Sequence, residues 1–406
     1  MRITHLPKEF VNARIVLESL ENHGFEAYFV GGSVRDIMMQ HPIHDVDIAT
    51  SAYPSEVEEV FLRTIDLGIE HGTILVLVNH EQYEVTTFRT ESGYQDYRRP
   101  DSVTFVRSLA DDLKRRDFRM NALAMTKEGE IIDLFSGIDD IQNKVICAVG
   151  NPSERFSEDA LRMMRALRFA SQLDFTIEKQ TFEAICRHHQ LLKKISVERI
   201  QVEWLKLMAG CNPKKGIHYF LESQCYQSCP HLEHSKEALL YLYHHVNQPL
   251  TEMQTWLVLS CAMQFSRKEC VRFLREWKCS KTVMNEVSHV LPYFYHRKER
   301  TLTDWEMYQL GEEGVSLIEN TLFFFEQAPE DIHWQTRYEQ LPIHHVKELA
   351  VDGKVLMAEL NKKPGRWLGE YIAKLQKAVI TKEVENKKDC LIALCQQWME
   401  QENEGI

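Results

Sequence analysis

Two stretches, seven residues apart, decide the fold of the N-terminal part: Ala27-Tyr28-Phe29-Val30-Gly31-Gly32-Ser33-Val34-Arg35-Asp36 and His44-Asp45-Val46-Asp47-Ile48-Ala49-Thr50. An apolar, β-prone run ends in two glycines, and a short amphipathic piece follows it. A second apolar run then contains two carboxylates one residue apart. This order predicts strand, turn, helix, loop and strand.

The two carboxylates are placed to act together. Side chains at alternate positions of a strand share one face, so Asp45 and Asp47 project together while Val46 and Ile48 face the core. Two neighbouring carboxylates repel each other unless a cation lies between them. Mg²⁺ suits this position, because it prefers oxygen and usually takes one or two carboxylates plus substrate phosphates.

The glycines and the following arginine predict phosphate binding beside these carboxylates. Gly31 and Gly32 allow a sharp turn that exposes backbone N–H groups at a helix start, and Arg35 adds a positive charge. A glycine pair alone is usually a plain turn, and an Asp-x-Asp alone is usually a solvated strand end. Their joint order indicates the phosphate cradle and metal ligands that nucleotidyl transfer requires.

These motifs contain neither a Walker loop nor a Gly-x-Gly-x-x-Gly dinucleotide fingerprint. They resemble the first motif of the DNA polymerase β nucleotidyltransferase superfamily, in the version found in class II tRNA nucleotidyltransferases and bacterial poly(A) polymerases. The resemblance implies that Asp45 and Asp47 are catalytic and hold Mg²⁺. It also implies that Gly32 and Arg35 contact nucleotide phosphates.

Composition limits the partners and the compartment. The 406 residues predict two to four domains, and a net charge of −12 means that any RNA must bind to local basic patches. The ten cysteines contain no Cys-x-x-Cys pair, which is typical of a reducing cytosol. No stretch approaches the roughly 20 apolar residues of a membrane span. We therefore expect a cytoplasmic protein with no membrane partner.

The first 150 residues predict a small mixed sheet backed by helices. A helical pattern covers residues 7–21, and residues 73–78 and 83–88 predict a hairpin. Residues 131–137 and 145–149 are expected to add the last strands of this sheet. Beyond residue 150 the pattern is almost entirely helical.

Two features of this part have alternative interpretations. Glu84 shares a strand face with Thr86 and could supply a third carboxylate to the metal, or it is an ordinary solvent-facing glutamate. Residues 89–100 predict a mobile loop. The loop resembles the family element associated with the final A addition, and the alternative is an uninvolved surface loop.

The segment from Lys114 to Ala124 is a second motif. If it is helical, Asp117 and Asn121 lie one turn apart and could bind a ribose, while Arg116 reaches a phosphate. Taken alone, Arg-Arg-Asp is more often a solvated helix start. The segment resembles the ribose-recognition motif of the family, which favours the nucleotide-binding interpretation with Arg116 in the site.

A third motif begins at Glu158-Asp159-Ala160-Leu161-Arg162. On a helix, Asp159 and Arg162 project together, and Arg165 and Arg168 extend their face. Such a pair is normally a surface salt bridge. The motif resembles the templating motif of class II tRNA nucleotidyltransferases, which implies that Asp159 and Arg162 read the incoming base. Arg165 and Arg168 would then lie near the triphosphate or the primer end.

An Asp–Arg pair has the chemistry to select bases. Cytosine and adenine both present an amino donor beside a ring-nitrogen acceptor, whereas uracil and guanine present a carbonyl in place of the amino group. A carboxylate only accepts hydrogen bonds and a guanidinium only donates them. The pair can therefore accept C or A and reject U and G. The following segment, with Ser196 as predicted N-cap before Arg199, resembles the helix-supporting motif of the family.

The sequence thus predicts an α+β chain with four parts. A small mixed β-sheet nucleotidyltransferase head at 1–150 is followed by an all-α neck at 151–217, body at 218–300 and tail at 301–406, where the tail binds tRNA. Basic patches for tRNA are predicted at Lys193-Lys194, Lys214-Lys215 and Lys362-Lys363-Arg366.

The resemblance implies an enzyme that adds CCA to tRNA 3′ ends from CTP and ATP with release of pyrophosphate, by two-metal in-line displacement. The alternatives are an A-adding tRNA nucleotidyltransferase or a poly(A) polymerase and, in another class, a non-catalytic RNA-binding protein on this fold. The sequence leaves the oligomeric state open, with a homodimer as one alternative.

Overall fold

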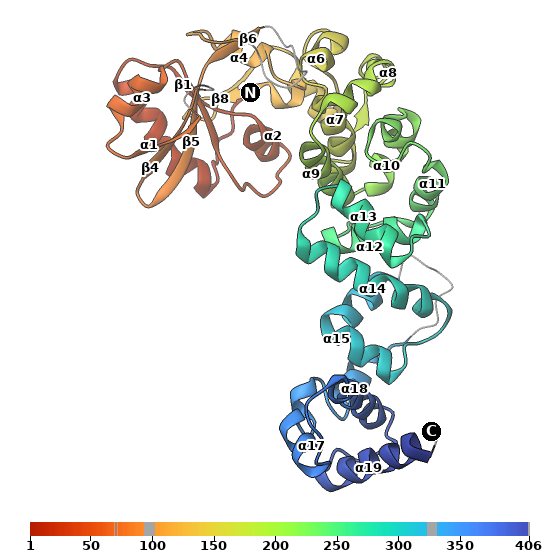
Figure 1. Cartoon of the computed structure of the whole chain (residues 1–406). Coiled ribbons are helices and arrows are strands. Elements are labelled where there is room, and N and C mark those ends of the chain that lie inside the picture. The colour runs from red at the N-terminus through yellow and green to blue at the C-terminus, as the bar shows by residue number, and fades with distance from the viewer. Residues whose placement is uncertain (69, 71, 93–101, 323–330, 405–406) are drawn as a thin grey trace. The chain divides into compact units, whose positions relative to one another are not determined.

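The structure is a computed structural model that describes residues 1–68, 70, 72–92, 102–322 and 331–404. Contacts along the chain divide it into two compact units, Met1–Thr251 and Glu252–Ile406. The strands gather in the N-terminal part of the first unit, drawn in red and orange in Figure 1, and the second unit is helical. An α+β fold with a mixed sheet in the head is therefore confirmed.

The head is built on a seven-stranded sheet in the order β3-β4-β5-β2-β1-β8-β9. Only the central β2–β5 pair is parallel, and the other neighbouring strands of this sheet are antiparallel. The strands of the sheet are β1 (Ala27–Val30), β2 (Asp47–Thr50), β3 (Thr64–Gly68), β4 (Thr73–Val78), β5 (Glu81–Thr87), β8 (Leu123–Met125) and β9 (Ile131–Asp133).

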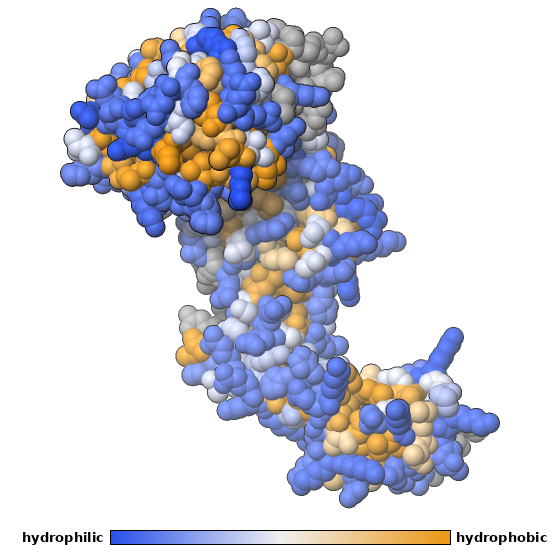
Figure 2. Space-filling model, turned by 90° about the vertical axis from the view of Figure 1, so that its left-hand side faces the viewer, coloured by the Kyte–Doolittle hydropathy of each residue, from blue (hydrophilic) through white to orange (hydrophobic). Residues whose placement is uncertain are grey.

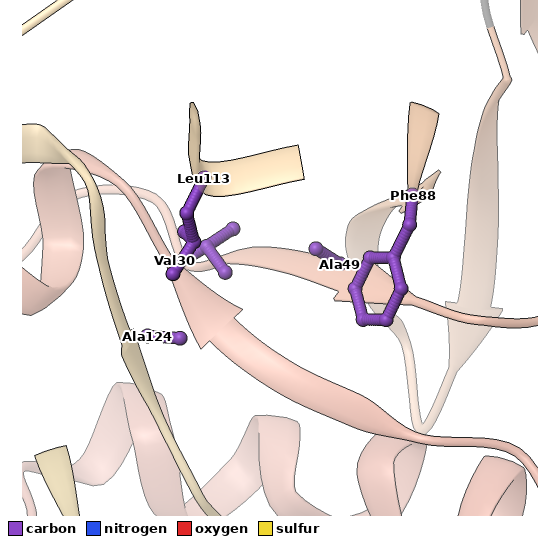
Figure 3. Packing of buried hydrophobic residues seen from close by; sticks show 5 residues of the cluster. All are labelled: Val30, Ala49, Phe88, Leu113 and Ala124. Atoms are coloured by element: carbon purple, nitrogen blue, oxygen red, sulfur yellow. The ribbon is translucent and has the colours of Figure 1, made fainter. Parts of the chain in front are cut away.

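Helices pack on this sheet through aromatic and aliphatic side chains. The helix expected at residues 7–21 is α1 (Lys8–Asn22), and its Phe10 meets Phe29 of β1 edge-to-face with ring centroids 5.0 Å apart. Figure 3 shows a cluster of buried core residues: Val30, Ala49, Phe88, Leu113 and Ala124. This cluster fixes α4 (Leu109–Lys114) against β1 and β2, which places the residues that follow α4 next to the glycine turn.

Several predictions of strands need correction. Val145–Ile146 does not join the head sheet, because this strand (β10) pairs in parallel with β11 (Thr176–Ile177) in a separate sheet. The edge strand β3 is additional to the predicted strands. Part of the expected loop is β6 (Arg89–Ser92), which pairs with β7 (Ser102–Phe105), and residues 93–100 of that prediction lie outside the described residues.

The rest of the first unit is helical apart from β10 and β11. Asn151 caps the first of these helices with its side chain, and Pro152 begins it. The head also contains the helices α2 (Gly32–Met38), α3 (Pro54–Val60) and α5 (Gly137–Gln142). The helices that follow the head in this unit are α6 (Pro152–Glu158), α7 (Leu161–Gln172), α8 (Lys179–His188), α9 (Val197–Met208), α10 (Pro213–Glu222) and α11 (Lys236–His245).

In the second unit, Trp256 and Trp277 are fully buried and their ring centroids lie 5.3 Å apart. Within the described ranges, none of the helices is both long and apolar enough to cross a membrane. Figure 2 shows hydrophilic side chains over much of the visible face, interrupted by apolar patches. The helices of this unit are α12 (Glu252–Ala262), α13 (Arg267–Glu276), α14 (Lys281–Glu299), α15 (Asp304–Glu319), α16 (Trp334–Glu339), α17 (Gly353–Glu359), α18 (Arg366–Ile380) and α19 (Lys388–Glu404).

Candidate active site

A cavity of about 470 Å³ in the first unit brings the three motifs together. Seven arginines and three aspartates line it, so positively charged side chains outnumber negatively charged ones at its wall, although the whole chain is negative. Its charged lining residues are Arg35, Asp47, Arg115, Arg116, Asp117, Asp159, Arg162, Arg165, Arg168 and Arg199, and Gly31 and Gly32 lie at its wall.

The glycine turn gives this wall its shape. Gly31 has φ of +75°, a left-handed conformation that side chains rarely adopt. A Cβ atom on Gly31 would lie 3.2 Å from Nη1 of Arg116 and 3.4 Å from Oδ2 of Asp47. A residue without a side chain is therefore required here, because it lets the backbone approach both charged groups. Gly32 begins α2 beside the Arg35 guanidinium, as the sequence predicted.

The two carboxylates of the first motif lie at the start of a central strand. β2 begins at Asp47, so Asp45 precedes the strand and is not within it as expected. The predicted alternation nevertheless holds, because Val46 and Ile48 are buried while Asp45 and Asp47 are exposed. Asp45 lines a second cavity of about 690 Å³ with Glu84. Asp47 lines both cavities.

Negative charge is concentrated around Asp47. The parallel register pairs Ile48 with Val85, so Asp47 and Glu84 are neighbours on adjacent strands. Although the side chain is open to solvent, the protein atoms packed around the Asp47 carboxylate partly desolvate it and raise its pKa, and the charges of Glu84 and Asp45 raise this pKa further against the opposing effect of Arg116. A divalent cation would relieve this repulsion.

The donor set around Asp47 fits a hard divalent cation in part. In the described part of the chain, no group of three or more His, Cys, Asp or Glu side chains is arranged to hold a metal ion. Asp45 and Asp47 supply two oxygen donors, which is the number that Mg²⁺ commonly takes from protein when phosphates complete its coordination.

The second motif forms a hydrogen-bonded network and not the helix considered for it. Asp117 lies in the loop after α4, and only Arg119–Asn121 form a short 3₁₀ helix. The two predicted side chains still meet, because Asn121 Nδ2 donates to Asp117 Oδ1 over 3.1 Å. Asn121 Oδ1 in turn accepts from Arg35 Nη1 at 2.7 Å. The polar side chains of α2 and the second motif are therefore linked.

Asp117 also connects the head to α7. Arg165 Nε donates to Asp117 Oδ2 over 2.7 Å. Burial acts to raise the pKa of Asp117, but the Arg165 guanidinium and the hydrogen bond from Asn121 outweigh it and lower this pKa to about 2. Asp117 is therefore a buried, charged link between the second and third motifs.

Asp112 holds the arginines of the second motif and was missed from the sequence. Its carboxylate is 1% exposed and binds Arg115 at 2.8 Å and Arg116 at 3.1 Å. The spacing of three and four residues on and just beyond α4 is a signal that could have identified it. The bond from Asp112 to Arg116 helps to keep the Arg116 guanidinium beside Gly31.

The third motif departs from the continuous helix that was expected. α6 ends at Glu158 and α7 begins at Leu161, so Asp159 lies at an extended junction between the two helices. Asp159 Oδ2 accepts a hydrogen bond from Arg199 Nη2 over 2.8 Å. The salt-bridge partner of Asp159 is therefore Arg199 and not Arg162. Both Asp159 and Arg162 line the arginine-rich cavity. The structure thus brings the predicted pair to one cavity by a different backbone path.

Arg162 is held by carbonyl oxygens and a glutamate. It donates to Glu158 Oε2 at 2.7 Å, to the Arg155 carbonyl at 3.1 Å and to the Arg115 carbonyl at 2.8 Å. These bonds use three of the five N–H groups of the guanidinium. The position of Arg162 is therefore set by groups other than its predicted partner.

Two charged residues of α9 support this cavity, and neither was assigned to the site from the sequence. Arg199 binds Asp159, and Glu203 pairs with Arg168 Nε at 2.6 Å with both side chains at least nine-tenths buried. Ser196 does occupy the N-cap position of α9, as predicted. Both pairs form where α9 packs against α7 and the junction before it. The two members of each pair are 35 or 40 residues apart in the sequence, so local spacing does not reveal them.

Comparisons with known proteins agree along nearly the whole chain. Residues 27–147 match the family described as "Poly A polymerase head domain", residues 174–235 match "Probable RNA and SrmB- binding site of polymerase A" and residues 247–395 match "tRNA nucleotidyltransferase domain 2 putative". The chain is 50% identical over 397 residues to a CCA-adding enzyme of Enterococcus faecalis, with 97% of each chain covered. It is 48% identical to one of Limosilactobacillus reuteri, covering 97% of this chain and 98% of the relative.

A solved structure has the same fold. The crystal structure of a Bacillus stearothermophilus CCA-adding enzyme in complex with CTP is 37% identical and has a TM-score of 0.90, with 99% of this chain and 100% of that chain covered. The motifs, the arginine-rich cavity and this similarity lead to one assignment. This chain belongs to the CCA-adding enzyme family of tRNA nucleotidyltransferases.

Proposed function

We propose that the chain adds the terminal C, C and A to tRNA 3′ ends from CTP and ATP, without a nucleic-acid template, and releases pyrophosphate. The observation that carries this proposal is the shared cavity, in which Asp47 lies with Asp159, Arg162 and further arginines. A nucleotide bound there can meet a carboxylate at its α-phosphate and an Asp–Arg pair at its base. The relatives named CCA-adding enzymes support the same activity.

In the proposed reaction, the tRNA 3′-oxygen forms a bond to the α-phosphorus, and the bond from that phosphorus to the β-phosphate oxygen breaks. The hydroxyl proton passes to solvent water, and pyrophosphate leaves. Asp45 and Asp47 would hold the Mg²⁺ ions, whose positive charge would activate the hydroxyl and neutralise the leaving pyrophosphate. Gly32, Arg35 and Arg116 hold the phosphates against the glycine turn.

Asp159 and Arg162 select the base in this proposal. Arg199 and the Leu161 N–H hold the Asp159 carboxylate, which retains lone pairs for an exocyclic amino group. Arg162 retains N–H groups for the ring acceptor. Uracil or guanine would place a carbonyl against Asp159, leaving two acceptors opposed. Arg165 and Arg168 lie toward the triphosphate.

The tRNA is proposed to bind along the helical parts, through local basic patches. In the tail, Lys362, Lys363 and Arg366 lie at and before the start of α18. The four-part division at residues 150, 217 and 300 remains a prediction. A cytoplasmic location is part of this proposal because tRNA is the proposed substrate, and none of the ten cysteines is joined in a disulfide. A homodimer remains an alternative to a monomer.

The test is to sequence the products formed on tRNA that lacks CCA, using CTP alone, ATP alone and both. CCA addition predicts –CC with CTP alone and –CCA with both nucleotides. Addition of only A to tRNA ending in CC would favour an A-adding enzyme, and long A tails would favour a poly(A) polymerase. A non-catalytic RNA-binding protein would release no pyrophosphate.

A further inference from the structure

Three guanidinium groups surround one aromatic ring at the cavity wall. The Cζ atoms of Arg168, Arg35 and Arg165 lie 4.0, 5.1 and 5.5 Å from the centroid of the Phe169 ring. Arg35 comes from α2, and the other two arginines come from α7. Phe169 is 4% exposed and lines the cavity. A cation within about 6 Å of a ring centroid is attracted to the ring.

Each of these arginines also has one acidic partner. Arg35 pairs with Asp36 at 2.7 Å, Arg165 with Asp117 at 2.5 Å and Arg168 with Glu203 at 2.6 Å. These acids lie on three different segments of the chain. Phe169 is thus a contact that the three cations share.

Like charges in this cluster repel one another. Burial lowers the pKa of Arg168, and the charges of Arg165 and Arg35 lower it further against the opposing effect of Glu203. The face of an aromatic ring is negative, so it attracts the guanidinium groups without adding a formal charge that would repel a phosphate. An additional carboxylate would also attract the arginines, but its negative charge would repel a phosphate ligand.

We propose that Phe169 is a positioning residue for the triphosphate of the incoming nucleotide, because its ring holds Arg35, Arg165 and Arg168 together at the cavity wall. This inference rests on the proposed function and assigns the phosphate-binding part of that site. The triphosphate is common to CTP and ATP. Loss of the ring therefore weakens the binding of both nucleotides to a similar degree and leaves the choice of base unchanged.

The experiment compares Phe169→Leu, which removes the ring, with Phe169→Tyr, which retains it. For Phe169→Leu we expect KM for CTP and for ATP to rise about tenfold, with a smaller change in kcat. Phe169→Tyr should remain within about threefold of the parent enzyme. Inorganic tripolyphosphate, used as a competitor of CTP, should bind about tenfold more weakly to Phe169→Leu.

Phe220→Leu is the matched control for loss of a buried ring in the same unit. Phe220 of α10 is fully buried against Trp204 and Tyr226. Thermal unfolding of all variants reports any general loss of packing. If Phe220→Leu and Phe169→Leu lowered Tm alike but only the latter raised KM, the positioning role would be supported.

Two results would overturn the inference. One is an unchanged affinity of Phe169→Leu for tripolyphosphate, and the other is a Phe169→Tyr variant as impaired as Phe169→Leu. Failure of the parent enzyme to extend tRNA lacking CCA would instead reject the proposed function. The tripolyphosphate measurement does not depend on catalysis, so the two failures are distinguishable.

Discussion

Asp159 and Arg199 form a salt bridge of 2.8 Å that ties the α6–α7 junction to α9. The Leu161 N–H also donates to Asp159 Oδ1 over 3.0 Å. The acidic half of the proposed template is therefore held from two sides, and its orientation depends on α9 as well as on its own motif.

Replacement of Asp159 by alanine should damage base selection more than folding. We expect the preference for CTP over UTP, measured as a ratio of kcat/KM values, to fall about 10- to 100-fold, because a mismatched carbonyl no longer opposes a carboxylate. Arg199→Ala should change the ratio in the same direction but less, since the Leu161 N–H remains. Asp174→Ala, which removes a surface salt bridge to Lys215, is the control. If Asp159→Ala still excluded UTP and GTP as well as the parent enzyme does, the assignment of Asp159 to the template would be wrong.

Replacement of Asp45 or Asp47 by asparagine should nearly abolish nucleotide incorporation. We expect a loss of at least about 10³-fold in rate, because metal-ion stabilisation of the transition state amounts to several kcal/mol. Binding of tRNA, measured by filter retention, should remain close to that of the parent enzyme. Glu58→Gln on α3 changes an exposed carboxylate of the same head and should have no effect. Retained turnover in either aspartate variant would contradict the metal assignment.

Glu84→Gln decides between the two interpretations of this strand residue. Since Glu84 lies beside Asp47 and raises its pKa, we expect the variant to need about tenfold more Mg²⁺ for half-maximal activity. The measurement is the rate of CMP incorporation over a range of Mg²⁺ concentrations. A magnesium dependence identical to that of the parent enzyme would indicate an ordinary solvent-facing glutamate.

The Asp117–Arg165 pair should control stability in acid. The pKa of Asp117 is lowered from 3.8 to about 2, so its charge stabilises the fold above about pH 4, and this contribution is lost as the pH falls toward 2. The contribution is on the order of 2 kcal/mol at neutral pH. Asp117→Asn should therefore be less stable above pH 4 and show a shallower decline in unfolding free energy below it. Urea titrations at several pH values measure this, and a decline as steep as in the parent would refute it.

Charge reversal in the tail should weaken tRNA binding without affecting nucleotide binding. Lys363→Glu and Arg366→Glu remove predicted phosphate contacts, so we expect lower tRNA affinity and a reduced dependence on salt, by about one in the log–log slope for each contact. Lys281→Glu, at the exposed start of α14, makes the same change in net charge elsewhere in the unit. An unaltered tRNA affinity in the tail variants would reject this assignment.

Local sequence order was sufficient to predict the central features of the head. The apolar runs that end at Val30 and begin beside Asp47 predict adjacent strands, and the glycines between them predict the turn, because period-two alternation and glycine geometry act over a few residues. The same reasoning failed at Val145–Ile146, whose apolar pattern cannot distinguish the head sheet from a pairing with Thr176–Ile177.

The sequence by itself determined which chemical groups the protein has: two carboxylates one residue apart, a glycine turn and an arginine-rich helix. Tertiary structure alone decided their partners. Asp159 binds Arg199, Arg168 binds Glu203 and Arg165 binds Asp117, across separations of 35 to 48 residues. Charge pairing depends on distance in space, and that distance is set by the packing of α7 against α9 and the head.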